Sequence, residues 1–180
     1  MVYKEKVLNL AIELVNLLNC DKDFIILCLG SKNCAGDSLG CLVGSILKYK
    51  YNISNYCYGD LIYNVNNKNL TNILEFIRKK HRKCKIIVVD SAIGYDFEVG
   101  DVKLKVNGLI PRSGVDNSYC NIGDIGIVGI VQSVKSDISN LFNIKIVKIF
   151  ELANFIADII MECKKILNVL NVKNVGTICN

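Results

Sequence analysis

The sequence is short of the residues that mark several protein classes: its 180 residues include no tryptophan, one proline and one histidine. One proline, and 13 glycines without a triplet period, exclude collagen-like and proline-rich architectures. A single histidine and the lack of any Cys-x-x-Cys pair argue against zinc-finger-type sites. Hydrophobic residues make up 51% of the chain and charged residues 22%, which excludes a disordered chain. We therefore expect one globular domain over residues 1–180.

Long hydrophobic runs are also lacking. Charge interrupts the longest apolar stretches, as Glu151 and Asp158 do within residues 149–161, whereas a membrane span needs roughly 20 nearly uncharged residues. The N-terminus carries Glu5 and Glu13 and has no small-residue cleavage site, so we expect no signal peptide and no membrane partner. Nine cysteines, an odd number without an export signal, predict reduced thiols and a cytoplasmic location.

Positive charge is concentrated in one run. The chain has 22 basic and 17 acidic residues, a net charge of +5, and its densest basic run is RKKHRK at 78–83. This run ends an amphipathic pattern, where basic side chains favour the negative end of the helix dipole. Because no aromatic residues are interleaved with these cations, we interpret the run as a solvated helix end and expect no nucleic-acid partner.

Hydrophobic periodicity alternates between the spacing of helices and that of buried strands. Apolar residues at helical spacing predict helices over residues 3–19, 38–48, 69–81 and 145–168. Short apolar runs predict strands over residues 24–29, 85–90 and 124–131, with a weak strand at 52–58 and a half-exposed one at 99–106. This alternation predicts an α/β domain, a three-layer α/β/α sandwich around a mostly parallel sheet.

Two carboxylates follow buried strands in this pattern. Asp37 lies one loop beyond the first strand and Asp90 at the tip of a later one, while Asp124 opens another strand and so could face the opposite edge. Ligands bind at the carboxyl ends of strands in such sheets. Two acids that converge there can share a proton and activate water, or hold a metal ion. The alternative is that Asp37 caps a helix and Asp90 caps a turn.

Two other chemistries fit the loop after the first strand poorly. The loop GSKNCAGDS at 30–38 departs from the phosphate-binding pattern GxxxxGK[ST], because Asp37 stands where lysine is needed and would repel a polyphosphate. Cys34 lies in the same loop, but cysteine catalysis needs a nearby base. We expect His81, at the end of a crossover helix, to lie elsewhere.

Five sequence blocks carry a family resemblance: CLGSKNCAGDSLGCLVG (28–44), VVDSAIG (88–94), VGDVKLK (99–105), IPRSGV (110–115) and NIGDIGIVGIV (121–131). In this order they resemble the YyaC-type spore protease family of spore-forming Firmicutes, over roughly residues 24–160. The resemblance implies the fold of hydrogenase maturation proteases and of the spore germination protease. In the former, a loop acid and a strand-end aspartate bind nickel; in the latter, aspartates are implicated in cleaving small acid-soluble spore proteins. By position, Asp37 matches the loop acid and Asp90 the strand-end aspartate.

The first functional hypothesis is therefore a sporulation-associated endopeptidase in the cytosol of the forespore or mother cell. Asp37 and Asp90 would share a proton, one polarising the scissile carbonyl and the other taking a proton from water. Backbone N–H groups of loop 30–36 would stabilise the oxyanion. The protein or peptide substrate would be contacted by residues around this pair: Gly30, Ser31, Gly36, Ser91, Arg112 and Asp124.

The sequence departs from the family pattern in three places. Cys41 replaces a proline, Arg112 and Ser113 depart from a PG-x-GV-like loop, and no histidine other than His81 is present to serve as a third metal ligand. Asp116 or Asp124 could supply an oxygen ligand instead, which suits nickel poorly. We therefore expect no nickel cofactor, but a metal-free pair or a weak divalent-cation site held by Asp37 and Asp90.

The second hypothesis is a non-catalytic module that keeps the peptidase fold and binds a peptide or protein partner in the same cleft. A third hypothesis is a nucleotide-binding signalling domain. The sequence leaves the oligomeric state open.

Overall fold

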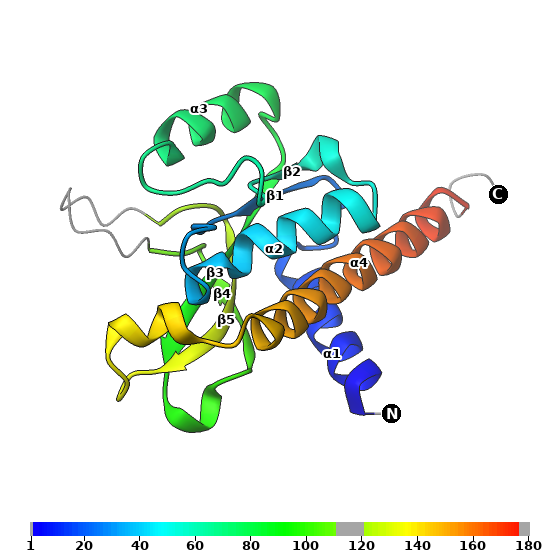
Figure 1. Cartoon of the computed structure of the whole chain (residues 1–180). Coiled ribbons are helices and arrows are strands. Elements are labelled where there is room, and N and C mark those ends of the chain that lie inside the picture. The colour runs from blue at the N-terminus through cyan, green and yellow to red at the C-terminus, as the bar shows by residue number, and fades with distance from the viewer. Residues whose placement is uncertain (1, 111–120, 177–180) are drawn as a thin grey trace.

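The fold is built on a five-stranded sheet. The computed structural model describes residues 2–110 and 121–176 (Figure 1). The strands lie in the order β2-β1-β3-β5-β4, and only the edge strand β4 is antiparallel to its neighbour. Their bounds are Phe24–Cys28 (β1), Cys57–Tyr58 (β2), Lys85–Gly94 (β3), Val102–Val106 (β4) and Ile125–Ser133 (β5). The principal helices are Val2–Leu17 (α1), Leu39–Ser45 (α2), Leu70–Lys80 (α3) and Ile146–Gly176 (α4).

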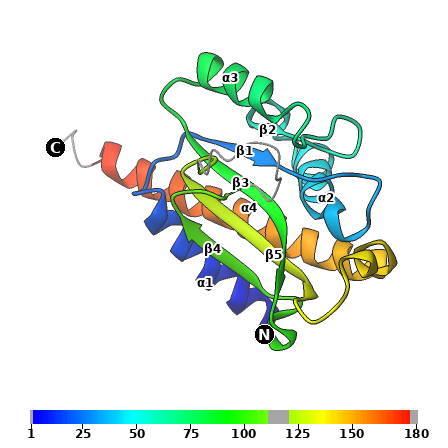
Figure 2. The ribbon, with the colours of Figure 1, turned by 90° about the vertical axis from the view of Figure 1, so that its left-hand side faces the viewer.

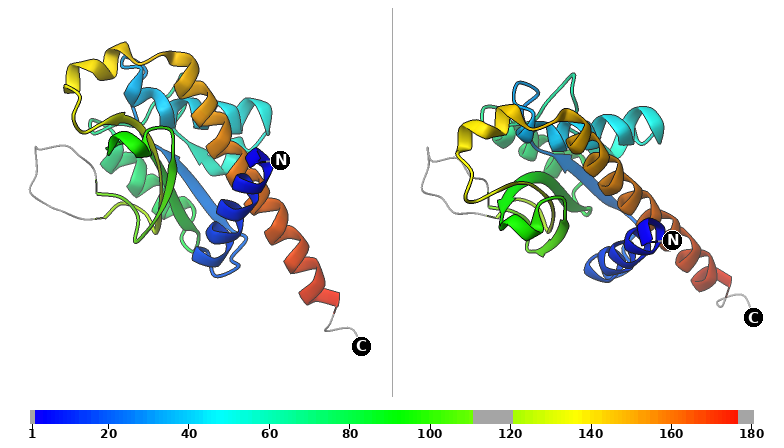
Figure 3. Two further views of the ribbon diagram at one scale, coloured as in Figure 1. Left: turned by 90° about the horizontal axis from the view of Figure 1, so that it is seen from below. Right: turned by 60° about the horizontal axis from the view of Figure 1, so that its bottom comes forward.

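Helices cover both faces of the sheet, which makes the expected three-layer α/β/α sandwich. Side chains alternate across β1, so Ile26 and Cys28 pack with α1, α2 and α4, whereas Ile25 and Leu27 pack with α3 on the other face. Figure 2 shows α3 apart from the other helices, and Figure 3 shows α1 lying beside α4. Burial on both faces explains why the central strands are almost continuously apolar.

Most elements predicted from the sequence are confirmed, with differences at their ends. The weak strand at 52–58 shortens to β2, because the backbone turns at Asn52 (φ 56°) and forms the 3-10 helix Ser54–Tyr56 before it. The helix over 38–48 continues from α2 through a π-helical turn, Ile46–Lys50. The last helix is longer than predicted, reaching Gly176. In the described residues, no helix combines the length and apolarity that crossing a membrane requires.

Helix α2 lies unusually close to the sheet because two glycines, one turn apart, face it. A Cβ built on Gly40 would lie 1.9 Å from the carbonyl oxygen of Leu29, and one on Gly44 would lie 1.8 Å from that of Gly59. No side chain fits at either position. These glycines therefore set how α2 approaches the ends of β1 and β2, and with it the position of the loop that precedes α2.

Candidate functional site

The strand order reverses direction between β1 and β3. From β1 the chain passes to β2 on one side, and from β3 it passes to β4 and β5 on the other. The carboxyl ends of the two strands flanking such a switch point form the usual ligand crevice of α/β sheets. The functional site is therefore expected beside the ends of β1 and β3.

A cavity of about 150 Å³ lies at this place. Both predicted acids, Asp37 and Asp90, line it, one contributed by the loop after β1 and the other by β3. Its other walls come from the end of β1 and from the segment before and at the start of α3: Leu29, Gly30, Asn66, Asn67 and Leu70. The structure thus brings the two carboxylates predicted from the sequence to one cavity.

Asp37 sits in the 3-10 helix Gly36–Ser38, directly before α2. Its backbone oxygen accepts the N–H of Ser31 at 3.0 Å, and a Cβ on Gly30 (φ 147°) would lie 2.2 Å from that oxygen, so Gly30 must be glycine. Burial raises the pKa of the Asp37 carboxyl, and a backbone hydrogen bond from Ser31 only partly opposes it. Asp37 therefore holds its proton to a higher pH than an exposed aspartate does.

Asp90 lies where β3 passes the end of β1. Its Oδ1 accepts a hydrogen bond from the backbone N–H of Ser91 at 2.7 Å, and the residue is half-buried. One oxygen is thus used locally, although Asp90 lies within β3 and not at the turn that the capping alternative expected. A carboxylate that accepts such a bond remains an acceptor through its other lone pairs, and Asp90 still lines the cavity.

Cys41 is a neighbour of both acids that the sequence did not single out for chemistry. Its side chain is fully buried, and the pKa of its thiol is raised to about 12 by burial first and then by Asp37, Asp60 and Asp90. A thiol with such a pKa is protonated at neutral pH and does not act as a nucleophile. Its role at this position is packing beneath the site.

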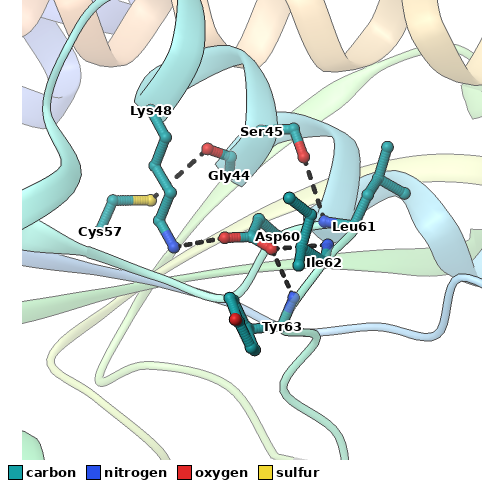
Figure 4. Close-up of polar contacts among 8 residues, drawn as sticks. All are labelled: Gly44, Ser45, Lys48, Cys57, Asp60, Leu61, Ile62 and Tyr63. Carbon is teal, nitrogen blue, oxygen red and sulfur yellow. Dashed lines mark hydrogen bonds and ion pairs between the residues drawn. The ribbon is translucent and has the colours of Figure 1, made fainter.

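The ion pair of Lys48 and Asp60 was missed altogether by sequence reasoning (Figure 4). The Lys48 Nζ lies 2.6 Å from Asp60 Oδ2, and the two side chains are 16% and 2% exposed. Asp60 Oδ1 also accepts the backbone N–H groups of Ile62 at 2.7 Å and Tyr63 at 2.6 Å. Burial raises the pKa of Asp60, but Lys48 and these N–H groups outweigh it, so the pKa is lowered overall.

This ion pair anchors the segment that forms one wall of the cavity. Directly after the Asp60 turn, the Asn64 side-chain amide donates to the carbonyl oxygen of Gly30 at 3.2 Å, and Val65 pairs with Leu29. The chain then continues into Asn66, which lines the cavity. The only signal in the sequence was a charged residue, Asp60, directly after a glycine at the end of a short strand.

The remaining expected contact residues lie in different places. Ser31 is in the loop beside Asp37, whereas Gly36 faces away, because a Cβ there would lie 2.6 Å from the Leu141 side chain. Asp124 lies at the opposite end of the sheet, where its Oδ2 accepts the N–H of Ile86 at 2.8 Å and it lines another cavity. Arg112, Ser113 and Asp116 lie outside the described residues.

The expected oxyanion donors are partly used elsewhere. The N–H of Gly30 donates to the carbonyl oxygen of Val65 at 2.9 Å, and that of Ser31 donates to the backbone oxygen of Asp37. Neither group can therefore stabilise an oxyanion without giving up a bond that shapes the loop. The expectation that backbone N–H groups of loop 30–36 stabilise the oxyanion is corrected for Gly30 and Ser31.

The donor set around the cavity does not fit nickel. The one histidine, His81, follows α3 at the far end of that helix, lines a different hollow and shares a 2.8 Å hydrogen bond with the Tyr58 hydroxyl. Carboxylate and amide oxygens would suit only a hard cation such as Mg²⁺. Within residues 2–110 and 121–176, no three His, Cys, Asp or Glu side chains form a metal-binding group. Because the one histidine, His81, lines that other hollow, Cys34 has no imidazole base beside it.

Together these features define a three-layer α/β/α protein with a carboxylate-lined cavity at the switch point of its sheet. Residues 2–159 match the family described as a protein of unknown function (DUF1256), and the chain belongs to this family. The chain is also 32% identical over 104 residues to the uncharacterized protein YyaC of Bacillus subtilis (strain 168). That alignment covers 58% of the chain and 51% of the Bacillus protein, so the chain spans about half the length of this curated relative.

Proposed function

We propose that the protein is a peptidase of sporulating cells that cleaves a protein or peptide substrate with Asp37 and Asp90. The observation that carries the proposal is that both carboxylates line one cavity at the switch point of the sheet. The raised pKa of Asp37 supports its proposed role as the acid of the pair that carries the proton.

In the proposed reaction, protonated Asp37 donates a hydrogen bond to the scissile carbonyl oxygen. The Asp90 carboxylate takes a proton from a water molecule, whose oxygen attacks the carbonyl carbon. The tetrahedral intermediate collapses when the C–N bond breaks and the amine nitrogen receives a proton from the acid pair. Each turnover consumes one water and returns the pair to its starting protonation. Any bound divalent cation would be an auxiliary held by the same two carboxylates.

The cytosol of the forespore or mother cell is the proposed site of action, by the family resemblance.

One observation favours a second candidate, a binding module without turnover: the Ser91 N–H occupies one oxygen of Asp90. In that case the same cavity would hold a peptide that is never cleaved.

The test is a cleavage assay on a peptide library prepared by tryptic digestion of a spore proteome, with new N-termini identified by mass spectrometry. Asp37→Asn and Asp90→Asn preserve size while removing the acid, and each is expected to lower cleavage at least about 100-fold, the lower range for lost acid–base catalysis. Asp101→Asn is the matched control, because Asp101 is exposed and its backbone, which bonds to Glu98 and Ile130, is left unchanged by the substitution.

Cleavage that persists in both active-site variants would rule out the carboxylate mechanism. Peptides that bind wild type and the two variants alike, with no new N-termini, would instead support the binding module. Folding of each variant is checked by its urea midpoint, so that a lost activity is not confused with a lost structure.

A further inference from the structure

Strand β3 runs on past the end of β1. The β1–β3 register ends at the pair Cys28 and Val89, yet β3 continues to Gly94, paired with β5 alone. In the part of the chain that the structure describes, no strand pairs with the β1-facing side of residues 91–94. Figure 2 shows β3 extending beyond β1 in this way.

The backbone groups that face this open side can be assigned from the ladder. Val89 faces β1, because its carbonyl oxygen accepts the Leu29 N–H at 2.8 Å. Ile86 faces the other way, because its carbonyl oxygen accepts the N–H of Asp124 next to β5 at 2.8 Å. In a parallel sheet the N–H and C=O of one residue point to the same side, and successive residues alternate. Ser91 therefore presents its N–H and C=O to the side that β1 has left.

The Ser91 N–H is covered by a group that a peptide could replace. Its acceptor is Oδ1 of the preceding residue, Asp90, at 2.7 Å. A charged side chain at an open strand edge is a common way to discourage pairing with other chains. Residues 90–94 are all half-buried rather than fully enclosed.

We propose that the substrate docks as an extended strand along residues 91–94 of β3, and that its carbonyl oxygen replaces Asp90 Oδ1 as the acceptor of the Ser91 N–H. Docking then takes the Ser91 N–H over from Asp90, which lines the same cavity as Asp37. This inference rests on the proposed function, because the docked segment is the peptidase substrate. The occupant is a polypeptide and no other class of ligand, since only a peptide backbone offers donors and acceptors at the spacing of a β-ladder.

Two properties of the substrate follow. Main-chain hydrogen bonds supply much of the affinity in strand addition, and side chains at alternate positions of the bound segment supply its specificity. The segment must be extended and free of other pairing, which selects unfolded regions and chain ends over helices and packed strands.

The test uses dodecapeptides selected from a random phage-displayed library on the full-length chain. The best one is resynthesised with a single N-methyl group at each position in turn, and its binding is measured by fluorescence anisotropy. N-methylation removes one donor and adds bulk at the ladder. Binding is expected to weaken at least about tenfold at alternate positions and to change little at the positions between, which are the matched controls.

A scan without this two-residue period, or a library that yields no binding peptide, would overturn the inference. A second measurement uses Ser91→Pro, which removes the N–H that faces the open edge while leaving the β3–β5 ladder donors in place, and which is expected to weaken the same peptide at least about tenfold. If that variant does not fold, the N-methyl scan on wild type decides alone. Periodic binding without cleavage would contradict the peptidase proposal and support strand docking. Cleavage without a two-residue period would support the peptidase proposal and contradict strand docking.

Discussion

Removing the Asp60 carboxylate is expected to be among the most destabilising single changes outside the apolar core. In Asp60→Ala the Lys48 ammonium loses its partner at 2.6 Å, and the N–H groups of Ile62 and Tyr63 lose their acceptor. Breaking a buried ion pair by deleting one partner costs about 3–5 kcal/mol. The Lys48 side chain is 16% exposed and can reach some water, which favours the lower end of this range of free energies. We predict a loss of about 3–4 kcal/mol of unfolding free energy.

Two further substitutions separate the contributions. Asp60→Asn keeps an oxygen for the two N–H groups and removes only the charge, so its loss is expected to be roughly half that of alanine. Lys48→Met leaves the Asp60 carboxylate buried but still bonded to the backbone. The Lys48 and Asp60 side chains are in direct contact. The double variant that combines Asp60→Ala with Lys48→Met is therefore expected to lose less unfolding free energy than the sum of the two single losses, with a coupling of about 1–3 kcal/mol.

The assay is urea unfolding of wild type and the four variants at pH 7 and at acid pH. The pKa of Asp60 is lowered in the folded state, so its contribution is complete above the ordinary value of 3.8 and is lost as the pH falls below it. The gap between wild type and Asp60→Asn should therefore narrow in acid. An Asp60→Ala protein within about 1 kcal/mol of wild type, with an unchanged m-value, would refute the reasoning.

Three other predictions follow from single contacts. Gly44→Ala places a Cβ 1.8 Å from the Gly59 carbonyl oxygen and is expected to destabilise by about 1–3 kcal/mol in thermal unfolding, where helix propensity alone predicts a gain. Asp124→Ala removes the acceptor of the Ile86 N–H and should cost about 1 kcal/mol by urea unfolding, while Asp124→Asn should recover most of it. Burial in the folded state raises the pKa of Asp37 above 3.8, so the unfolding free energy of wild type falls as the pH rises from 3.8 through the raised pKa. Asp37→Asn has no acid to ionise at this position and does not undergo this loss. Its urea midpoint relative to that of wild type should therefore be higher at pH 7 than at pH 3.

The layers of the fold could be predicted from the sequence because each layer leaves a local signal. The run at 24–29 is apolar at every position since β1 is buried on both faces. The ends of elements carry weaker signals. The length of β3 was underestimated because the prediction stopped at Asp90, whereas the ladder with β5 continues past it through a register shift between Ala92 and Ile93.

The site could be predicted only as far as its residues follow strands. Asp37 and Asp90 were found because topology alone brings strand ends together. The Lys48–Asp60 pair was missed because its partners are 12 positions apart on elements whose mutual approach depends on the close packing of Gly44. Asp124 begins its strand rather than ending one, which places it at the opposite edge of the sheet.

The walls of the cavity are held by contacts that do not use the two acids as acids. Asp37 fixes its loop through its backbone oxygen, which accepts the Ser31 N–H, and asparagine would leave that bond intact. The opposite wall is held by the Lys48–Asp60 pair and by the bond from Asn64 to Gly30. An asparagine at position 90 likewise retains an oxygen for the Ser91 N–H. The Asp→Asn variants therefore change the chemistry of the pair while leaving its frame in place, which is why a loss of cleavage in a folded variant would report on the proposed reaction itself.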